Sequence, residues 1–188
     1  MRMKQRSYTL VEILMVAGMI ALIAALILVT YNGVYRSWST GNTVAAMKGA
    51  HLALDRYMLE HGSYPVCNLT TMREMAAAVG DAKLTHGLLQ DCSPYSKKYG
   101  TDGVIIFDDF GDKKGSNLHE IKYIYTPSVN GLASFVLISA GRDGVFGSDE
   151  GDDVIYLPSG NSTLKPGFYT GNFKTGTGEI EDAEPIAQ

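Results

Sequence analysis

Residues 13–29 read ILMVAGMIALIAALILV, which is seventeen consecutive apolar or glycine residues. No charged residue occurs from position 13 to position 35, so 23 residues could lie in hydrocarbon. An α-helix needs about 20 such residues to span a bilayer. The basic residues Arg2, Lys4 and Arg6 precede the run. The positive-inside rule therefore predicts a cytoplasmic N-terminus, with the bulk of the chain on the other side of the membrane.

A cleaved secretory signal and a plain membrane anchor are the two simpler interpretations of this run. A signal peptide has a shorter apolar region that ends in a small-residue cleavage site, whereas this run continues into residues 30–33 (TYNG) without an A-x-A pattern. A plain anchor does not explain Glu12 at the head of the run, because an ionised carboxylate at the bilayer centre costs about 2.5–3.5 kcal/mol. We therefore expect Glu12 to have a partner.

The segment SYTLVEILMV at residues 7–16 resembles the prepilin N-terminal motif of type IV pilins and type II secretion pseudopilins. In that family a membrane-embedded peptidase cuts before the aromatic residue and methylates the new amine. The resemblance implies a leader at residues 1–7 and cleavage between Ser7, where the family usually has glycine, and Tyr8. Glu12 then becomes the fifth mature residue. A buried carboxylate needs a counter-ion, and the amine of Tyr8 in a neighbouring subunit would supply one and set the register of polymerisation.

The helix is predicted to continue beyond the apolar run. On one face, apolar residues recur at helical spacing, and these are Met47, Ala50, Leu54 and Tyr57. Charged residues lie on the opposite face. Gly62 is a typical helix end. We therefore expect a membrane or filament-core helix over 8–35 and an amphipathic continuation over 36–62. The segment ALDRYMLEHGSYP at 53–65 resembles the end of the long helix in major pseudopilins of type II secretion systems.

Residues 63–157 are predicted to form a globular α/β head. Thr71 and Glu74 make a capping box that indicates a short helix ending at Gly80. Runs rich in β-branched and aromatic residues predict the strands of a small antiparallel sheet, at 104–107, 121–126, 132–139 and 154–157. The expected fold class is thus α+β, a long N-terminal helix packed on a small sheet, as in type IV pilins.

The last part of the chain, residues 158–188, is expected to be a C-terminal extension that is partly flexible. Glycine recurs through it, and its end, 179–188, is predicted to be disordered because it has few residues that could form a core.

An acidic loop, SAGRDGVFGSDEGDD, occupies residues 139–153 and has five carboxylates. Composition alone favours a solvated turn, although such oxygen-rich loops also suit Ca²⁺, which takes six to eight oxygen ligands at about 2.3–2.6 Å. The loop resembles the calcium loop near the C-terminus of major pseudopilins. That resemblance implies a calcium cofactor whose ligands are the side chains of Asp143 and Asp153, with Asp149, Asp152 and the carbonyls of Ala140 and Val145 as further candidates.

The two cysteines, Cys67 and Cys92, lack the paired spacing of a zinc or thioredoxin-type site. In an oxidising compartment they could close a disulfide, and the alternative is two free thiols. The net charge of −4 disfavours a nucleic-acid partner. The chain has no Walker A sequence, no G-x-S-x-G elbow and no H-E-x-x-H motif, so we do not expect an enzyme.

The resemblance implies a structural subunit that polymerises into a periplasmic type II secretion pseudopilus supporting protein export. The alternative is a subunit of a type IV pilus for adhesion, motility or DNA uptake, and a third reading is a membrane-bound sensor or lectin-like domain that never polymerises. The expected partners are further copies of the chain, minor pilin-like subunits, inner-membrane assembly proteins and the prepilin peptidase. The expected location is the inner membrane, crossed once, with a periplasmic head.

Overall fold

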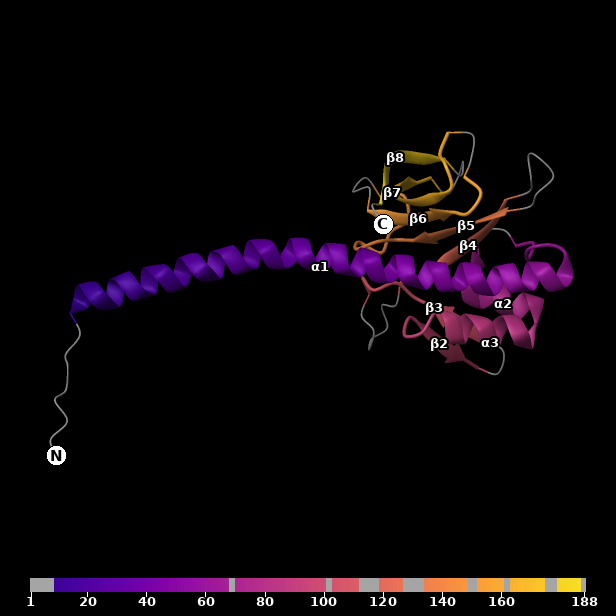
Figure 1. Ribbon diagram of the computed structural model, residues 1–188, viewed down its shortest axis with the longest axis horizontal. Helices are drawn as coiled ribbons and strands as arrows, with labels where there is room; N and C mark the ends of the chain where they lie inside the picture. The colour runs from indigo at the N-terminus through magenta and orange to yellow at the C-terminus, as the bar shows by residue number, and fades with distance from the viewer. Residues whose placement is uncertain are drawn as a thin grey trace, which may run out of the picture. The chain divides into compact units, whose positions relative to one another are not determined.

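The computed structural model describes most of the chain, and Figure 1 shows its helices and strands. The described residues are 9–67, 70–100, 103–111, 119–126, 134–148, 152–160, 163–174 and 179–186. The elements in chain order are α1 (Leu10–His61), β1 (Thr70–Thr71), α2 (Met72–Val79), α3 (Ala82–Asp91), β2 (Ser96–Tyr99), β3 (Gly103–Ile106), β4 (Lys122–Thr126), β5 (Ser134–Ser139), β6 (Asp153–Leu157), β7 (Gly167–Phe173) and β8 (Ile180–Pro185). The fold is therefore α+β, a long N-terminal helix followed by antiparallel sheet. Contacts divide the chain into two compact units, Met1–Trp38 and Ser39–Gln188.

The first unit contains the apolar part of α1, which begins with a reciprocal cap. The backbone N–H of Thr9 donates to Glu12 Oε2 at 2.8 Å, and the N–H of Glu12 donates to Thr9 Oγ1 at 3.3 Å. The large apolar side chains described between Leu10 and Trp38 are exposed, and α1 is long and apolar enough to cross a membrane. A core helix of a soluble domain would instead bury these side chains.

The second unit begins with the amphipathic part of α1, which is continuous with the apolar part, as predicted. Met47, Ala50 and Leu54 are fully buried, which confirms the predicted inner face. The helix ends where Gly62 takes a positive φ of 78° and donates its N–H to the carbonyl of Met58 at 2.7 Å. Glycine suits this position because it has no Cβ to oppose a left-handed backbone.

Two short helices follow, and only the first was predicted. In α2, Thr71 and Glu74 form the expected capping box and Gly80 ends the helix in the left-handed conformation. The second helix, α3, has Asp81 as its N-cap, directly after Gly80, the C-cap of α2. The sequence does not predict α3 because its capping residue adjoins the stop signal of the preceding helix.

The strands form two sheets, in which every pairing is antiparallel. The larger sheet has the order β1-β4-β5-β6-β7-β8, and the smaller one pairs β2 with β3. The predicted strand at 104–107 is therefore present but belongs to the smaller sheet. In Figure 1 the second part of α1 lies between the six-stranded sheet and the group of α2, α3, β2 and β3.

The C-terminal segment contains two strands that the sequence did not predict. Residues 158–188 were expected to be a partly flexible extension, yet β7 and β8 complete the six-stranded sheet. The predicted disorder is wrong over Ile180–Pro185, which pairs with β7 from Phe173↔Ile180 to Tyr169↔Pro185. The acidic composition of β8 is not typical of a strand. Its backbone N–H and C=O groups nevertheless find hydrogen-bond partners in β7, and this pairing makes the segment a strand. Residues 187 and 188 lie outside the described part.

The six-stranded sheet has apolar side chains on both faces. One face shares a buried cluster with α1, α2 and α3, in which Met47 and Leu54 of α1 accompany Tyr123, Phe135 and Leu137 of the sheet. The other face has a separate cluster, made by Val136, Ile138, Ile155, Leu157, Tyr169 and Phe173. Since side chains alternate along a strand, neighbouring residues of β5 such as Phe135 and Val136 serve different clusters.

Both cysteines are free thiols in this structure, which is the alternative that the sequence left open. Cys92 is buried, and burial raises the pKa of its thiol to about 12, with a further contribution from the charge of Asp91. Burial also raises the pKa of the half-buried Cys67. Because the thiolate is the reactive form, neither side chain is suited to nucleophilic chemistry at neutral pH.

Candidate metal site in the acidic loop

The acidic loop joins β5 to β6, and its two ends lie against each other. Gly141 has a φ of 61°, and a Cβ at this position would overlap the backbone carbonyl of Asp152. Any other residue at Gly141 would therefore force the ends apart. This close approach brings Arg142 and Asp152 within hydrogen-bond distance, since the N–H of Arg142 donates to Asp152 Oδ2 at 2.8 Å.

Each described carboxylate of the loop accepts backbone hydrogen bonds through one oxygen. Asp143 Oδ1 accepts from the N–H of Val145 at 2.8 Å. Asp153 Oδ2 accepts from Gly147 at 2.9 Å and from Phe173 of β7 at 3.0 Å. These bonds orient Asp143 and Asp153 and leave their second oxygens for other partners.

The second carboxylate oxygens of Asp152 and Asp153 are both buried without a hydrogen-bond partner among the described residues. This oxygen is Oδ1 in each side chain. Asp153 as a whole is only 1% exposed. Burial raises its pKa against the opposing effect of its two backbone hydrogen bonds, and the charges of Asp152 and Asp143 raise it further. A buried anionic oxygen without a partner is costly, and a bound cation would remove that cost.

A buried polar network supports the start of the loop. Ser139 donates its hydroxyl to Asp108 Oδ2 at 2.5 Å, and Asp108 Oδ1 accepts from the N–H groups of Phe110 and Gly111. His119 Nδ1 lies 3.0 Å from the carbonyl oxygen of Gly141, so this nitrogen must be the donor. Burial raises the pKa of Asp108. The sequence does not predict this network because its members come from three separated segments and form no motif.

The structure describes all of the predicted calcium ligands except Asp149. Ala140 is buried, whereas Val145 is 57% exposed. Asp149 lies outside the described residues. In the described part of the chain, Asp143, Asp152 and Asp153 do not place one oxygen each within 4.8 Å of the others, the spacing at which such groups could share an ion. The loop thus has two buried carboxylate oxygens without a hydrogen-bond partner among the residues that the structure describes, but its three described carboxylates do not converge on one point.

The predicted assembly residue, Glu12, lies in the first turn of α1. Its Oε2 accepts from both the N–H of Thr9 at 2.8 Å and the hydroxyl of Thr9 at 3.0 Å. The predicted processing residues Ser7 and Tyr8 lie outside the described part of the chain. The carboxylate of Glu12 is therefore engaged by the helix's own cap in this structure.

The fold and the loop together define an α+β protein with a long apolar N-terminal helix, an antiparallel sheet and an acidic loop between β5 and β6. Comparison of the chain with protein-family models, with curated proteins and with solved structures found no match.

Proposed function

We propose that this chain is a type IV pilin-like structural subunit that polymerises into a type II secretion pseudopilus and supports protein export. The observation that carries the proposal is the apolar part of α1, whose large described side chains are exposed from Leu10 to Trp38 and whose first turn contains Glu12. Such a helix needs lipid or other apolar helices around it. A membrane supplies the first environment before assembly, and a filament core of identical helices supplies the second.

In this proposal the assembly step is the transfer of the helix from the membrane into the filament core. The prepilin peptidase removes residues 1–7 by cutting between Ser7 and Tyr8, and the amine of Tyr8 then pairs with Glu12 of an adjacent subunit. A carboxylate has about four acceptor positions, so the bonds from Thr9 leave room for this amine. The pair sets the axial position of each new subunit, and the chain has no catalytic role.

The membrane topology follows from the same proposal. The helix crosses the inner membrane once, the leader is cytoplasmic, and the head is periplasmic. Assembly requires inner-membrane assembly proteins and minor pilin-like subunits besides further copies of this chain. A type IV pilus is the alternative. True pilins more often have a C-terminal disulfide loop, whereas here both cysteines precede the acidic loop and are free, which favours the pseudopilus.

Mass spectrometry of the protein isolated from its native membrane tests the processing step. The expected mature chain begins at Tyr8 and has a methylated N-terminal amine. Electron microscopy of material sheared from the same cells is expected to show filaments that contain this chain. An intact chain that begins at Met1, together with sheared material free of such filaments, would contradict the proposal.

We also propose that the acidic loop binds calcium as a structural ion. Asp143 and Asp153 supply side-chain oxygens, Asp152 is the next candidate, and the buried Oδ1 atoms of Asp152 and Asp153 support a cation in the loop. Calcium would supply positive charge to carboxylates that repel one another. Because β6 begins at Asp153 and Phe173 of β7 donates to it, an ion in the loop would hold the ends of two strands in place.

Calcium is expected to raise the melting temperature of the full chain in detergent by about 5–10 °C relative to EGTA. A ligand at a hundredfold excess over its Kd stabilises by about 2.7 kcal/mol, and each kcal/mol shifts the melting temperature of a chain this size by about 2–4 °C. Circular dichroism checks this. Asp143→Ala is expected to lose most of the difference, whereas Glu184→Gln on the exposed β8 keeps it. An equal calcium effect in both variants would remove the hypothesis.

A further inference from the structure

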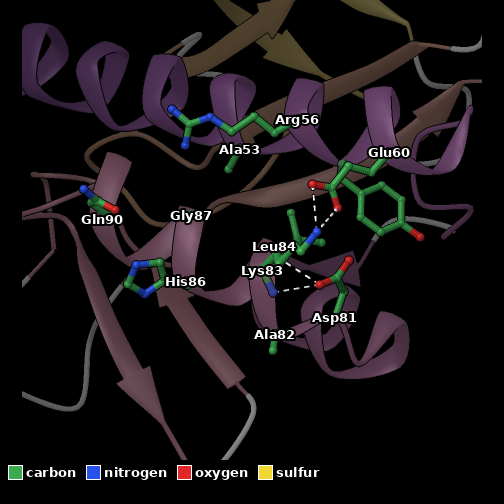
Figure 2. A pocket seen from close by; sticks show the side chains of 11 residues that line it. Ala53, Arg56, Glu60, Asp81, Ala82, Lys83, Leu84, His86, Gly87 and Gln90 are labelled. Carbon is green, nitrogen blue, oxygen red and sulfur yellow. Dashed lines mark hydrogen bonds and ion pairs between the residues drawn. The ribbon is translucent and has the colours of Figure 1, made fainter.

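A second group of side chains that could hold a metal ion lies where α1 ends and α3 begins. Glu60, His61 and Asp81 each place one ligand atom within 4.8 Å of the others. His61 Nε2 is 3.6 Å from Asp81 Oδ2. Figure 2 shows Glu60 on α1 and Asp81 at the start of α3, with the side chain of Lys83 reaching the Glu60 carboxylate. All of these residues belong to the second compact unit, so the group forms within one folded body.

The hydrogen bond of His61 determines which of its nitrogens can bind a metal. Nδ1 lies 3.1 Å from the backbone carbonyl oxygen of Tyr57. A carbonyl oxygen can only accept, so Nδ1 is the protonated nitrogen. In neutral His61 the lone pair is therefore on Nε2, the atom that lies nearest Asp81 Oδ2. The ring of Tyr57 stacks on the ring of His61 with centroids 4.0 Å apart and holds this orientation.

The carboxylate of Asp81 is oriented in a comparable way. Its Oδ1 accepts from the N–H of Lys83 at 2.7 Å and from the N–H of Leu84 at 3.4 Å, as the N-cap of α3. These bonds leave Oδ2 for the imidazole. Two acceptors, Nε2 of neutral His61 and Oδ2 of Asp81, thus lie 3.6 Å apart. A proton on His61, a bridging water or a metal ion would each make this approach favourable.

The third residue, Glu60, is currently paired with Lys83. The Lys83 ammonium lies 3.0 Å from Glu60 Oε1 and 2.9 Å from Oε2. The side chain of Lys83 is 77% exposed, and exposed ion pairs contribute at most about 1 kcal/mol. Displacing Lys83 from Glu60 is therefore inexpensive, and the ammonium would move into solvent while an incoming ion takes its place.

We propose that Glu60, His61 and Asp81 bind a divalent transition-metal ion of the zinc class and so join the end of α1 to the start of α3. An imidazole nitrogen with two carboxylate oxygens is a ligand set that suits zinc, and water can complete the tetrahedron. The Nδ1–H of His61 on a backbone carbonyl is the arrangement that orients metal-binding histidines. This site is separate from the acidic loop, whose ligands are all oxygens, and it does not depend on the proposed function.

The test is isothermal titration of ZnCl₂ into the full chain in detergent, with calcium present in excess to occupy the acidic loop. His61→Asn is expected to weaken zinc binding at least about tenfold, since changes to the residues around a metal cost about 10–100-fold in affinity. His86→Asn is the matched control, because His86 is an exposed histidine of α3 outside the group. Lys83→Met is expected to tighten binding, because it frees Glu60.

Lys83→Met is the variant that separates a metal site from a merely structural contact. If the Lys83–Glu60 pair only stabilises the fold, its removal will lower the melting temperature and leave the affinity for zinc unchanged. If Lys83 competes with the metal for Glu60, its removal will raise the affinity for zinc. Circular dichroism melts without zinc check that each variant is folded. Absence of saturable zinc binding to the wild-type chain, unchanged affinity in His61→Asn, an equal loss in His86→Asn, or binding in Lys83→Met that is not tighter would each overturn the site.

Discussion

Replacing Glu12 with alanine is expected to abolish filament formation while the head keeps its melting temperature. In the proposed filament the carboxylate of Glu12 neutralises the amine of Tyr8 in the adjacent subunit within an apolar core. Removing one partner of a buried ion pair costs about 3–5 kcal/mol, because the other charge remains buried and uncompensated. This cost recurs at every subunit added. The head is a separate compact unit that begins at Ser39, so its stability does not depend on Glu12.

The measurement is a count of filaments by electron microscopy of sheared material from cells that make each variant. Thr9→Val is the matched control. It removes the hydroxyl that donates to Glu12 at 3.0 Å and accepts from its N–H, yet it keeps the carboxylate. If Glu12 acts only as a helix cap, the two variants will assemble equally poorly or equally well. Filaments of normal number and unchanged rise per subunit in Glu12→Ala would refute the proposed role.

Gly49→Ala is expected to give a large loss of stability from a single added methyl group in the head. Gly49 is in α1, and a Cβ there would lie 2.6 Å from the carbonyl carbon of Asp91 and overlap its oxygen. Those atoms are backbone at the end of α3 and cannot rotate away. Overpacking of this kind costs about 1–3 kcal/mol, which exceeds the gain of about 0.5–1 kcal/mol that alanine usually brings to a helix.

Urea denaturation of the full chain in detergent, followed by circular dichroism, gives the free energy of unfolding of each variant. Gly41→Ala is the matched control because Gly41 is in the same helix and a Cβ there meets nothing within 4 Å. It is expected to stabilise by up to about 1 kcal/mol, through helix propensity alone. A higher free energy of unfolding in both variants would show that α1 and α3 are not packed as closely as the structure has them.

The sequence determined the elements whose signals are local. Residues 13–29 specify an apolar helix, because an uncharged run long enough to span a bilayer can be recognised without knowing any tertiary contact. The inner face of the continuing helix follows from helical periodicity, and its end follows from Gly62. The limits of α2 were likewise readable, because the Thr71–Glu74 cap and the Gly80 stop are made by neighbours in the chain.

Only the tertiary structure decided the features that depend on contacts between distant segments. The segment Ile180–Pro185 is a strand because β7 supplies its hydrogen-bond partners, although its own composition is acidic and ends in proline. In the described part of the chain, Oδ1 of Asp153 is buried without a hydrogen-bond partner because of how the loop packs, which the sequence does not show. Nor does any motif connect His61 with Asp81, which lie twenty positions apart and meet because α3 returns against α1. Side chains that meet through packing leave no pattern in the local sequence, since their spacing is set by the path of the chain rather than by the period of a helix or strand.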